Sequence, residues 1–255
     1  MYPEERQQAI AELISTRGRI SVADLSSTYG VTTETVRRDL AVLDRLGVVR
    51  RVHGGAVPAS ALTATEPGVG EREYTRAEQK DAIAAAALAF LPPPGGSTVL
   101  DAGTTTGRLA ALLSSERELI LITNSVPIGA RVASLPGIKL RMLGGRVRGT
   151  TQAAVGEEAL AALAWLRTDV AFIGTNALSL GHGLSTPDSD EAAVKRAMVR
   201  SANHVVVLAD SSKIGREHLV SFARLDDIDV LITDDGIDDN DHKSLTDQGI
   251  EVVIA

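Results

Sequence analysis

Hydrophobic positions in the first 57 residues recur at the spacing of three short amphipathic helices. The three apolar faces are Ile10, Leu13 and Ile14, then Val22, Leu25 and Tyr29, then Val36, Leu40 and Leu43. Ser21 and Thr32 can cap the second and third helices, and a glycine follows each helix. The segment 48–55 then alternates like a short hairpin closed by glycines. Three helices and a hairpin predict a winged helix-turn-helix domain over residues 1–57.

The rest of the chain has the pattern of an α/β domain. Residues 58–71 are rich in Ala, Thr, Pro and Gly with little apolar periodicity, which predicts a linker. A helix is expected over 72–90, and strand-like apolar runs then alternate with helical stretches. These runs are Thr98–Leu100, Leu119–Ile122, Ile138–Leu143, Val170–Ile173, Val205–Leu208, Val230–Ile232 and Val252–Ile254. The alternation predicts a larger, mainly parallel α/β domain over 72–255, with helices covering both faces of its sheet.

Charge and composition narrow the possible functions. The 255 residues carry a net charge of −7, yet residues 1–57 hold eight arginines against seven acids, so the acidity belongs to the second domain. No cysteine is present, which excludes disulfides and thiolate metal sites, and the five histidines show no metal-ligand spacing. The first six residues are acidic, and the longest apolar stretch, 82–91, is too short to span a bilayer. We therefore expect a cytoplasmic protein without metal, cofactor or membrane contact.

The third predicted helix carries the chemistry of a DNA-reading element. With Val36 and Leu40 turned inward, Thr33, Arg37 and Arg38 lie on the outer face. Arginine can bridge guanine O6 and N7 in the major groove, and threonine can reach phosphates or base edges. The alternative is a solvated helix whose arginines pair with acidic neighbours, namely Glu34, Asp39 or Asp44. The helix order and the glycine punctuation favour DNA binding.

Three blocks of sequence resemble the signature of the DeoR family of bacterial transcriptional regulators. They cover 19–25, 31–40 and 46–56, and the second half of the chain also fits the family. Thr32 stands where the family usually has serine, and threonine can still cap the helix. The expected DNA-binding residues are Thr32, Thr33, Thr35, Arg37, Arg38, Arg50, Arg51 and His53. The family resemblance implies a repressor that binds double-stranded operator DNA as a homo-oligomer.

Polar clusters follow five of the predicted strands. They are 101–107, 123–125, 144–145, 174–176 and 210–213. Because parallel strands end at one edge of a sheet, these clusters should converge on a shared crevice. The first cluster contains Gly-Thr-Thr-Thr-Gly, which suits a phosphate at a helix N-terminus. Taken alone, this motif is more often an ordinary strand-to-helix turn, and the five polar turns in register favour the shared pocket.

The resemblance implies that the second domain senses a sugar phosphate and is similar in fold to ribose-5-phosphate isomerase. The expected effector-binding residues are Asp101, Gly103, Thr104, Thr105, Thr106, Asn124, Ser125, Gly145, Thr175, Asn176, Asp188, Glu191, Lys195 and Lys213. Ser125 is expected from the polar clusters alone, and the others match motifs of the family. The motifs 174–176 and 186–188 are similar to those of family members associated with fructose uptake, which makes fructose 1-phosphate the expected effector.

The isomerase likeness also raises an alternative, a sugar-phosphate isomerase-like enzyme. Such enzymes place acidic residues after the strand that matches 169–176, where this chain has Ile173 and Asn176. Glu191, near Lys195, could still accept a proton. The sequence favours a regulator over an enzyme.

Two further side-chain assignments concern residues outside these motifs. Trp165 is expected in the core, at the end of a helix over 155–166. Arg146 and Arg148 could face either the crevice or solvent, and the sequence does not decide between them.

Overall fold

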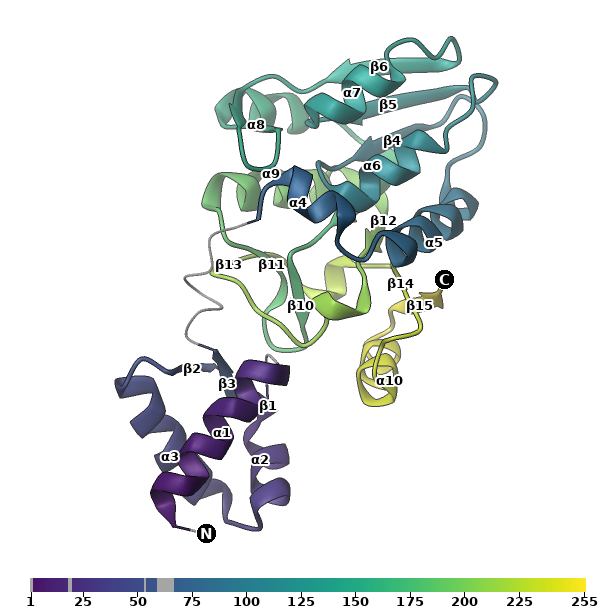
Figure 1. Ribbon diagram of the computed structural model, residues 1–255. Helices are drawn as coiled ribbons and strands as arrows, with labels where there is room; N and C mark the ends of the chain where they lie inside the picture. Colours follow the sequence, from purple (N-terminus) through teal and green to yellow (C-terminus); the bar gives the residue numbers. More distant parts are fainter. Residues whose placement is uncertain (1, 18–19, 53, 59–66) are drawn as a thin grey trace.

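The computed structural model describes residues 2–17, 20–52, 54–58 and 67–255, and in its N-terminal part it contains the predicted three helices and hairpin. The elements are α1 (Pro3–Arg17), β1 (Ile20–Ser21), α2 (Val22–Tyr29), α3 (Thr33–Arg45), β2 (Val49–Val52) and β3 (Gly55–Pro58). The strands form an antiparallel sheet of order β1-β3-β2 (Figure 1). The second hairpin strand runs to Pro58, three residues beyond the predicted hairpin.

The caps predicted for α2 and α3 are present. Ser21 Oγ accepts a hydrogen bond from the backbone N–H of Asp24 (3.0 Å), and Thr32 Oγ1 accepts one from Thr35 N–H (3.2 Å). Gly30 ends α2 with φ of 61°, a left-handed conformation that favours glycine. The predicted apolar faces form one core, in which the fully or nearly fully buried helical residues are Ile10, Ile14, Leu25, Val36, Leu40 and Leu43.

A seven-stranded parallel sheet forms the centre of the second domain. Its order is β15-β14-β12-β9-β4-β5-β6, and every predicted apolar run supplies one strand. The strands are β4 (Ser97–Leu100), β5 (Leu119–Thr123), β6 (Ile138–Met142), β9 (Thr168–Gly174), β12 (Ala202–Leu208), β14 (Val230–Thr233) and β15 (Glu251–Ile254). This sheet confirms the predicted α/β class.

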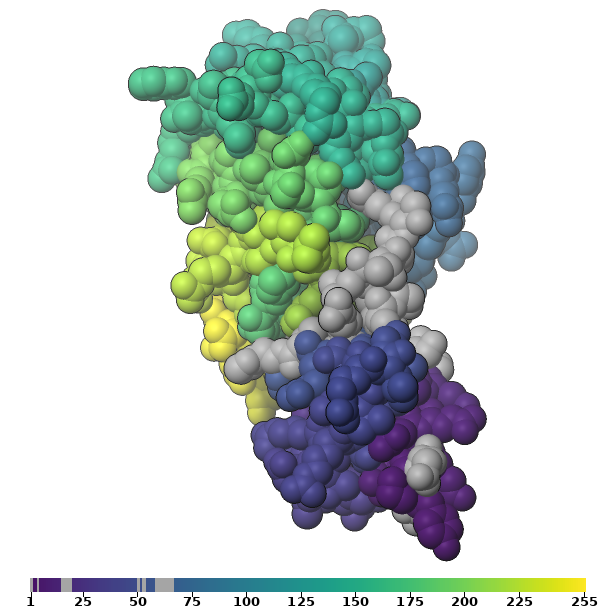
Figure 2. Space-filling view, turned by 90° about the vertical axis from the view of Figure 1, so that its left-hand side faces the viewer, coloured from purple at the N-terminus to yellow at the C-terminus, as the bar shows by residue number. Residues whose placement is uncertain are grey.

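Helices cover both faces of this sheet, because alternate strand residues pack on opposite sides. Val99 and Ala171 belong to one apolar cluster with α8, α9 and α10, whereas Leu100 and Phe172 belong to another with α5, α6 and α7. The helices are α5 (Ala77–Ala87), α6 (Thr104–Ala111), α7 (Val126–Val132), α8 (Glu157–Leu163), α9 (Ser189–Arg200) and α10 (Asp239–Asp247). Figure 2 shows the N-terminal unit, in purple and dark blue, at one end of the molecule and this domain, mainly in teal, green and yellow, at the other.

Short elements lie around the main sheet. β7 (Arg146–Arg148) pairs with β8 (Ala153–Val155), and β10 (Ala177–Ser179), β11 (Gly183–Thr186) and β13 (Val220–Ala223) form an antiparallel sheet. The described residues also form the short 3-10 turns η2 (Leu88–Phe90), η3 (Ser211–Lys213) and η4 (Leu225–Asp227).

The prediction of a single helix over 72–90 is wrong, because the helical conformation is interrupted at Arg76. A separate helix α4 spans Val69–Tyr74, starting inside the predicted linker, and α5 begins at Ala77. Arg76 adopts φ of 52° between them, and its guanidinium reaches Asp210 (3.1 Å) and Asp234 (2.6 Å) beyond the strand ends. These ion pairs hold the residue in a conformation that a continuous helix would not allow.

The prediction of a buried Trp165 is also wrong, since 91% of this residue is exposed. Val155 belongs to β8, Gly156 turns the chain with φ of 107°, and α8 ends at Leu163. Ala159 and Leu163 already fill the inner face of this short helix, so Trp165 falls beyond its end and outside the core.

Candidate functional site

The outer face of α3 presents two arginines to solvent. The side chains of Arg37 and Arg38 are 57% and 80% exposed, on the side of the helix opposite buried Val36 and Leu40. Glu34, one turn earlier, lies 3.9 Å from Arg37 Nη1 and 3.6 Å from Arg38 Nε. Such exposed pairs are weak, so they leave both guanidiniums available to another partner.

The acidic neighbour Asp39, unlike Glu34, does not face these arginines. Asp39 is turned inward, where Oδ2 accepts from Arg6 Nε (2.6 Å) and Oδ1 accepts from Gln7 Nε2 (2.9 Å). Hydrogen bonding to Asp39 raises the pKa of Arg6 above its ordinary value. This buried pair joins α1 to α3 and thereby fixes the angle at which α3 presents its outer face.

The remaining predicted DNA-binding residues lie on two elements. Thr33 is exposed at the start of α3, while the hydroxyls of Thr32 and Thr35 lie 2.9 Å apart within the helix cap. Arg50 and Arg51 belong to β2, and Arg51 is exposed. His53 lies outside the described residues.

A cavity of about 360 Å³ opens at the carboxyl end of the parallel sheet. It brings together residues from the ends of β4, β9 and β12 with residues from α4, α5, α6 and α9. The predicted effector-binding residues that line it are Gly103, Thr104, Thr105, Thr106, Thr175, Asn176, Glu191, Lys195 and Lys213. Three of the five predicted strand-end clusters, 101–107, 174–176 and 210–213, therefore converge on one crevice, whereas 123–125 and 144–145 contribute no residue to its lining.

The N-terminus of α6 forms one wall of this cavity. Gly103 precedes the helix and gives it no side-chain cap, so the first backbone N–H groups of α6 have no partner within the helix. Thr106 Oγ1 donates to the carbonyl oxygen of Asp101 (2.7 Å), which folds the loop tightly against the end of β4. The wall combines helix-terminal N–H groups with threonine hydroxyls, a combination that suits an anion.

Lys195 of α9 is held at the cavity wall by a buried network. Its ammonium group forms an ion pair with Asp101 and donates to the carbonyl oxygen of Gly174 (3.0 Å). Asp101 Oδ2 also accepts from Gly174 N–H (3.1 Å), and the Phe222 ring centroid lies 5.5 Å from the ammonium. Asp101 is therefore a support behind the wall, and Lys195 reaches the cavity.

Four other predicted residues also lie away from the cavity lining. Asn124 bridges the N–H of Ala102 and the carbonyl oxygen of Ala154, both at 3.1 Å, and so positions the loop before α6. Ser125 caps α7, and Asp188 caps α9. Gly145 has φ of 124°, and a Cβ there would lie 2.4 Å from the Val155 carbonyl oxygen, so this glycine serves backbone packing.

The structure distinguishes the two arginines that the sequence left undecided. Arg148 is mostly buried, and its guanidinium contacts Glu191 (2.6 Å) and Asp188 (3.2 Å) beside the cavity. Arg146 is exposed and pairs with Asp190 (2.5 Å). Arg148 therefore positions a lining carboxylate, whereas Arg146 faces solvent.

Three cationic residues of the cavity are absent from the sequence prediction: Arg72 of α4, Lys80 of α5 and Arg216. Burial lowers the pKa of Lys80 to about 8, with Lys213 and Arg108 adding to the effect. Burial, together with Arg216, Arg72 and Arg76, also lowers the pKa of Lys213. A signal for Lys80 existed, because it is one of only five lysines in the chain and precedes the alanine-rich stretch of its helix.

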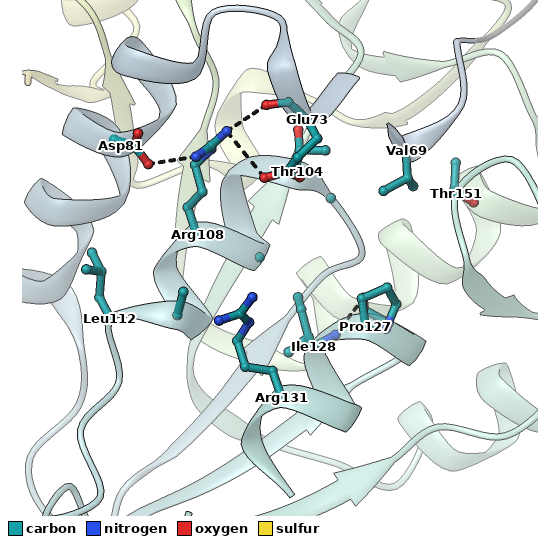
Figure 3. Close-up of a pocket in the computed structure, with 14 residues that line it drawn as sticks. Val69, Glu73, Asp81, Thr104, Arg108, Leu112, Pro127, Ile128, Arg131 and Thr151 are labelled. Carbon is teal, nitrogen blue, oxygen red and sulfur yellow. Dashed lines mark hydrogen bonds and ion pairs between the residues drawn. The ribbon is translucent and has the colours of Figure 1, made fainter. Parts of the chain in front are cut away.

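A second cavity of about 430 Å³ lies on the other side of the α6 N-terminus and shares Gly103 and Thr104 with the first. Figure 3 shows Arg108 at its edge, where it binds Glu73 (3.3 Å) and Asp81 (2.8 Å), and Arg131 projecting toward the space. Val69 and Thr151 border it on the far side (Figure 3). Arg108 thereby ties α4 and α5 to α6.

Within the described ranges, no three His, Asp or Glu side chains are grouped closely enough to hold a metal ion. The same ranges contain no helix with the length and apolar character needed to cross a bilayer. Ile173 and Asn176 stand where a sugar-phosphate isomerase would carry acidic residues. Ile173 is fully buried in β9, and Asn176 lines the cavity.

Comparison with known proteins gives matches over both domains. A model of the DeoR-like helix-turn-helix domain matches residues 6–61, and one of the DeoR C terminal sensor domain matches 75–235. A putative aga operon transcriptional repressor of Escherichia coli O157:H7 is 34% identical over 98% of this chain and 93% of its own length. The HTH-type transcriptional regulator GlpR of Haloferax volcanii is 38% identical over 99% of this chain and 98% of its own length.

Among solved structures, ribose 5-phosphate isomerase A from Methanocaldococcus jannaschii is 18% identical over 55% of each chain, with a TM-score of 0.41. This distant likeness concerns the fold of the second domain and carries nothing about activity. The full-length sequence similarity and the two family matches, one to each domain, agree with the arrangement of the structure. The chain belongs to the DeoR family of DNA-binding transcriptional regulators.

Proposed function

We propose that this regulator represses a sugar-utilisation operon and leaves its operator when a phosphorylated sugar occupies the cavity at the carboxyl end of the sheet. The cavity carries this proposal: its walls combine the α6 N-terminus with Lys195, Lys213 and further cations. Helix N–H groups and fixed cations together favour a phosphate. Thr175 and Asn176 supply polar groups of the kind that hydroxyls of a sugar would need.

DNA binding is assigned to the outer face of α3, with β2 and the turn after it contacting the flanking backbone. Arg37 and Arg38 are the residues proposed to read base edges, and Thr33 to contact a phosphate or base. Arg50, Arg51 and His53 are proposed to hold the DNA backbone. Residues 1–57 serve as the reading head, 58–71 as the connection and 72–255 as the sensor.

Fructose 1-phosphate is the proposed effector. The proposal rests on the motifs at 174–176 and 186–188. Thr175 Oγ1 donates to the carbonyl oxygen of Ala177 (2.7 Å), which holds the first motif in a turn at the cavity wall. Release would occur in a homo-oligomer whose two arrangements differ in effector affinity, since a ligand shifts an equilibrium only by that difference.

The test is operator binding by fluorescence anisotropy while fructose 1-phosphate, ribose 5-phosphate or free fructose is added. We expect release by fructose 1-phosphate and none by free fructose. Release by ribose 5-phosphate alone would contradict the choice of effector and leave the sugar-phosphate proposal in place. Equal potency of free and phosphorylated sugar, or no response to either phosphate, would contradict the proposal.

The same mixtures distinguish a sensor from an isomerase. A sensor should show a rise in melting temperature with ligand and an unchanged sugar phosphate after incubation. Conversion of the sugar phosphate that disappears in Glu191→Gln would instead support an enzyme.

A further inference from the structure

The hydrogen bonds and ion pairs of helix α4 are its main attachments to the sensor domain. None of its six residues is buried, and it contributes to none of the apolar clusters. These attachments include the Val69 N–H to the Thr150 carbonyl oxygen (2.9 Å) and Lys80 Nζ to the Arg72 carbonyl oxygen (2.5 Å). Arg108 Nη2 also reaches the carbonyl oxygen (2.6 Å) and the carboxylate (3.3 Å) of Glu73. Without apolar anchoring, the position of α4 depends on the charges around it.

Two neighbouring residues of α4 serve different cavities. Glu73 belongs to the second cavity, where Arg108 holds it (Figure 3). Arg72 lines the first cavity, together with Lys80 and Lys213. Its Nε and Nη2 atoms are buried, yet neither has a hydrogen-bond partner among the described residues.

A buried guanidinium nitrogen without an acceptor is costly. Arg76, Arg108 and Arg117 also leave a buried Nε without a hydrogen bond, but their terminal nitrogens have acceptors, whereas Nη2 of Arg72 has none within the described part of the chain. Arg148 binds Glu191, and Arg108 binds Asp81. The acceptors that Arg72 lacks could be oxygens of a phosphate, which match the planar guanidinium with two parallel hydrogen bonds. Burial is the main cause of the lowered pKa of Lys213, and Arg72 is one of the neighbouring cations that lower this pKa further.

We propose that Arg72 contacts an anionic group of the bound effector, so that occupancy of the cavity restrains α4. This inference rests on the proposed function of the cavity and assigns it a further residue. Because α4 is the first helix after the DNA-binding unit among the described residues, its restraint passes the state of the cavity to the segment that joins the two domains. Arg72 thus links binding of the effector to release of the operator DNA.

The test compares Arg72→Gln with Arg131→Gln. Both replace an arginine with an amide of similar length, but Arg131 lines only the second cavity. Affinity for fructose 1-phosphate is measured by calorimetry, operator release by anisotropy, and exposure of 69–74 by hydrogen exchange with and without the ligand. Arg72→Lys is the second variant, which keeps the charge and loses the fork of donors.

We expect Arg72→Gln to bind operator DNA normally, to lose about ten- to a hundredfold in ligand affinity, and to lose ligand-dependent protection of 69–74. Arg131→Gln should match the wild type, and Arg72→Lys should fall between. If the wild type responds to the ligand and Arg72→Gln responds identically, the inference is wrong while the proposed function stands. If neither fructose 1-phosphate nor ribose 5-phosphate affects the wild type, the proposed function itself fails.

Discussion

Lys195 of α9 and Asp101 at the end of β4 form an ion pair that is buried on both sides, although 94 positions separate them in the sequence. The side chains are 5% and 1% exposed. The pair joins the first strand of the parallel sheet to the last helix that borders the cavity. Gly174, at the end of β9, hydrogen-bonds to both partners and completes a connection across two neighbouring strands.

Asp101→Asn should therefore destabilise the sensor domain by about 3 to 5 kcal/mol, because it leaves a buried ammonium without its counter-charge. The measurement is the free energy of unfolding from a urea titration. Asp190→Asn is the matched control, since Asp190 forms an exposed pair with Arg146 and should cost at most about 1 kcal/mol. Equal free energies of unfolding for the two variants would show that the buried pair stabilises the domain no more than the exposed pair does.

Arg37→Ala and Arg38→Ala should each weaken specific operator binding by about 1 to 3 kcal/mol, because each removes a base contact in the major groove. Sensor-domain stability should not change, since both side chains are exposed on a separate unit. The measurement is a gel-shift titration at fixed salt concentration. Arg224→Ala, which removes an exposed arginine from the second domain, is the control for net charge. Wild-type affinity in both α3 variants would exclude this helix as the reading element.

Periodicity predicted most of the fold because each element buries one regular face. The α3 face at Val36, Leu40 and Leu43 and the strand run at 170–173 are repeated patterns that need only local sequence. The failures arose where a distant contact decides. Arg76 breaks a helical sequence because its partners lie at Asp210 and Asp234, and no local pattern announces that pairing.

The same distinction holds for the candidate site. The strand-end rule correctly brought residues 103–106, Thr175, Asn176 and Lys213 to one cavity, and Lys195 was expected there only from the family resemblance. It could not separate lining residues from the supports behind them, so Asp101 was expected to touch the ligand. It also missed Arg72, which the sequence placed at the start of one continuous helix over 72–90 and which lies in the separate helix α4 before the break at Arg76.

Affinity for a sugar phosphate should fall as the pH rises above about 8. Burial lowers the pKa of Lys80 to about 8 against opposition from Asp210 and Glu73, and with support from Lys213 and Arg108. A bound phosphate stabilises the charged ammonium and raises that pKa, so binding near pH 8 takes up a proton. Calorimetry in buffers of different ionisation enthalpy measures the uptake.

Lys80→Met should reduce this proton uptake and flatten the pH dependence. The same lysine has a predicted effect on unfolding. Its folded pKa lies below the unfolded value of 10.5, so the unfolded chain binds more protons between about pH 8 and 10.5. The contribution of Lys80 therefore makes the ligand-free protein more stable as the pH rises through that range, and the variant should lack this contribution. An unchanged proton uptake in Lys80→Met would place the anion away from α5.

Changes in the loop before α6 should alter the response to the effector and leave DNA binding intact. A Cβ at Gly103 would lie 3.1 Å from Thr106 Oγ1, the hydroxyl that holds the loop to Asp101. Gly103→Val should therefore both displace that hydroxyl and obstruct the approach of a phosphate to the α6 N–H groups. Thr105→Ala removes a hydroxyl at the cavity wall and should cost about 0.5 to 1.5 kcal/mol in binding.

Lys213→Ala should also weaken the response, since it removes a cation from the same cavity. Each variant should bind operator DNA as the wild type does, because α3 belongs to a unit with its own core. Each should need more sugar phosphate for release, measured by fluorescence anisotropy against effector concentration. Gly107→Ala is a control within α6, because a Cβ there meets no atom within 4 Å. Identical release curves for Gly103→Val and the wild type would mean that the phosphate binds elsewhere.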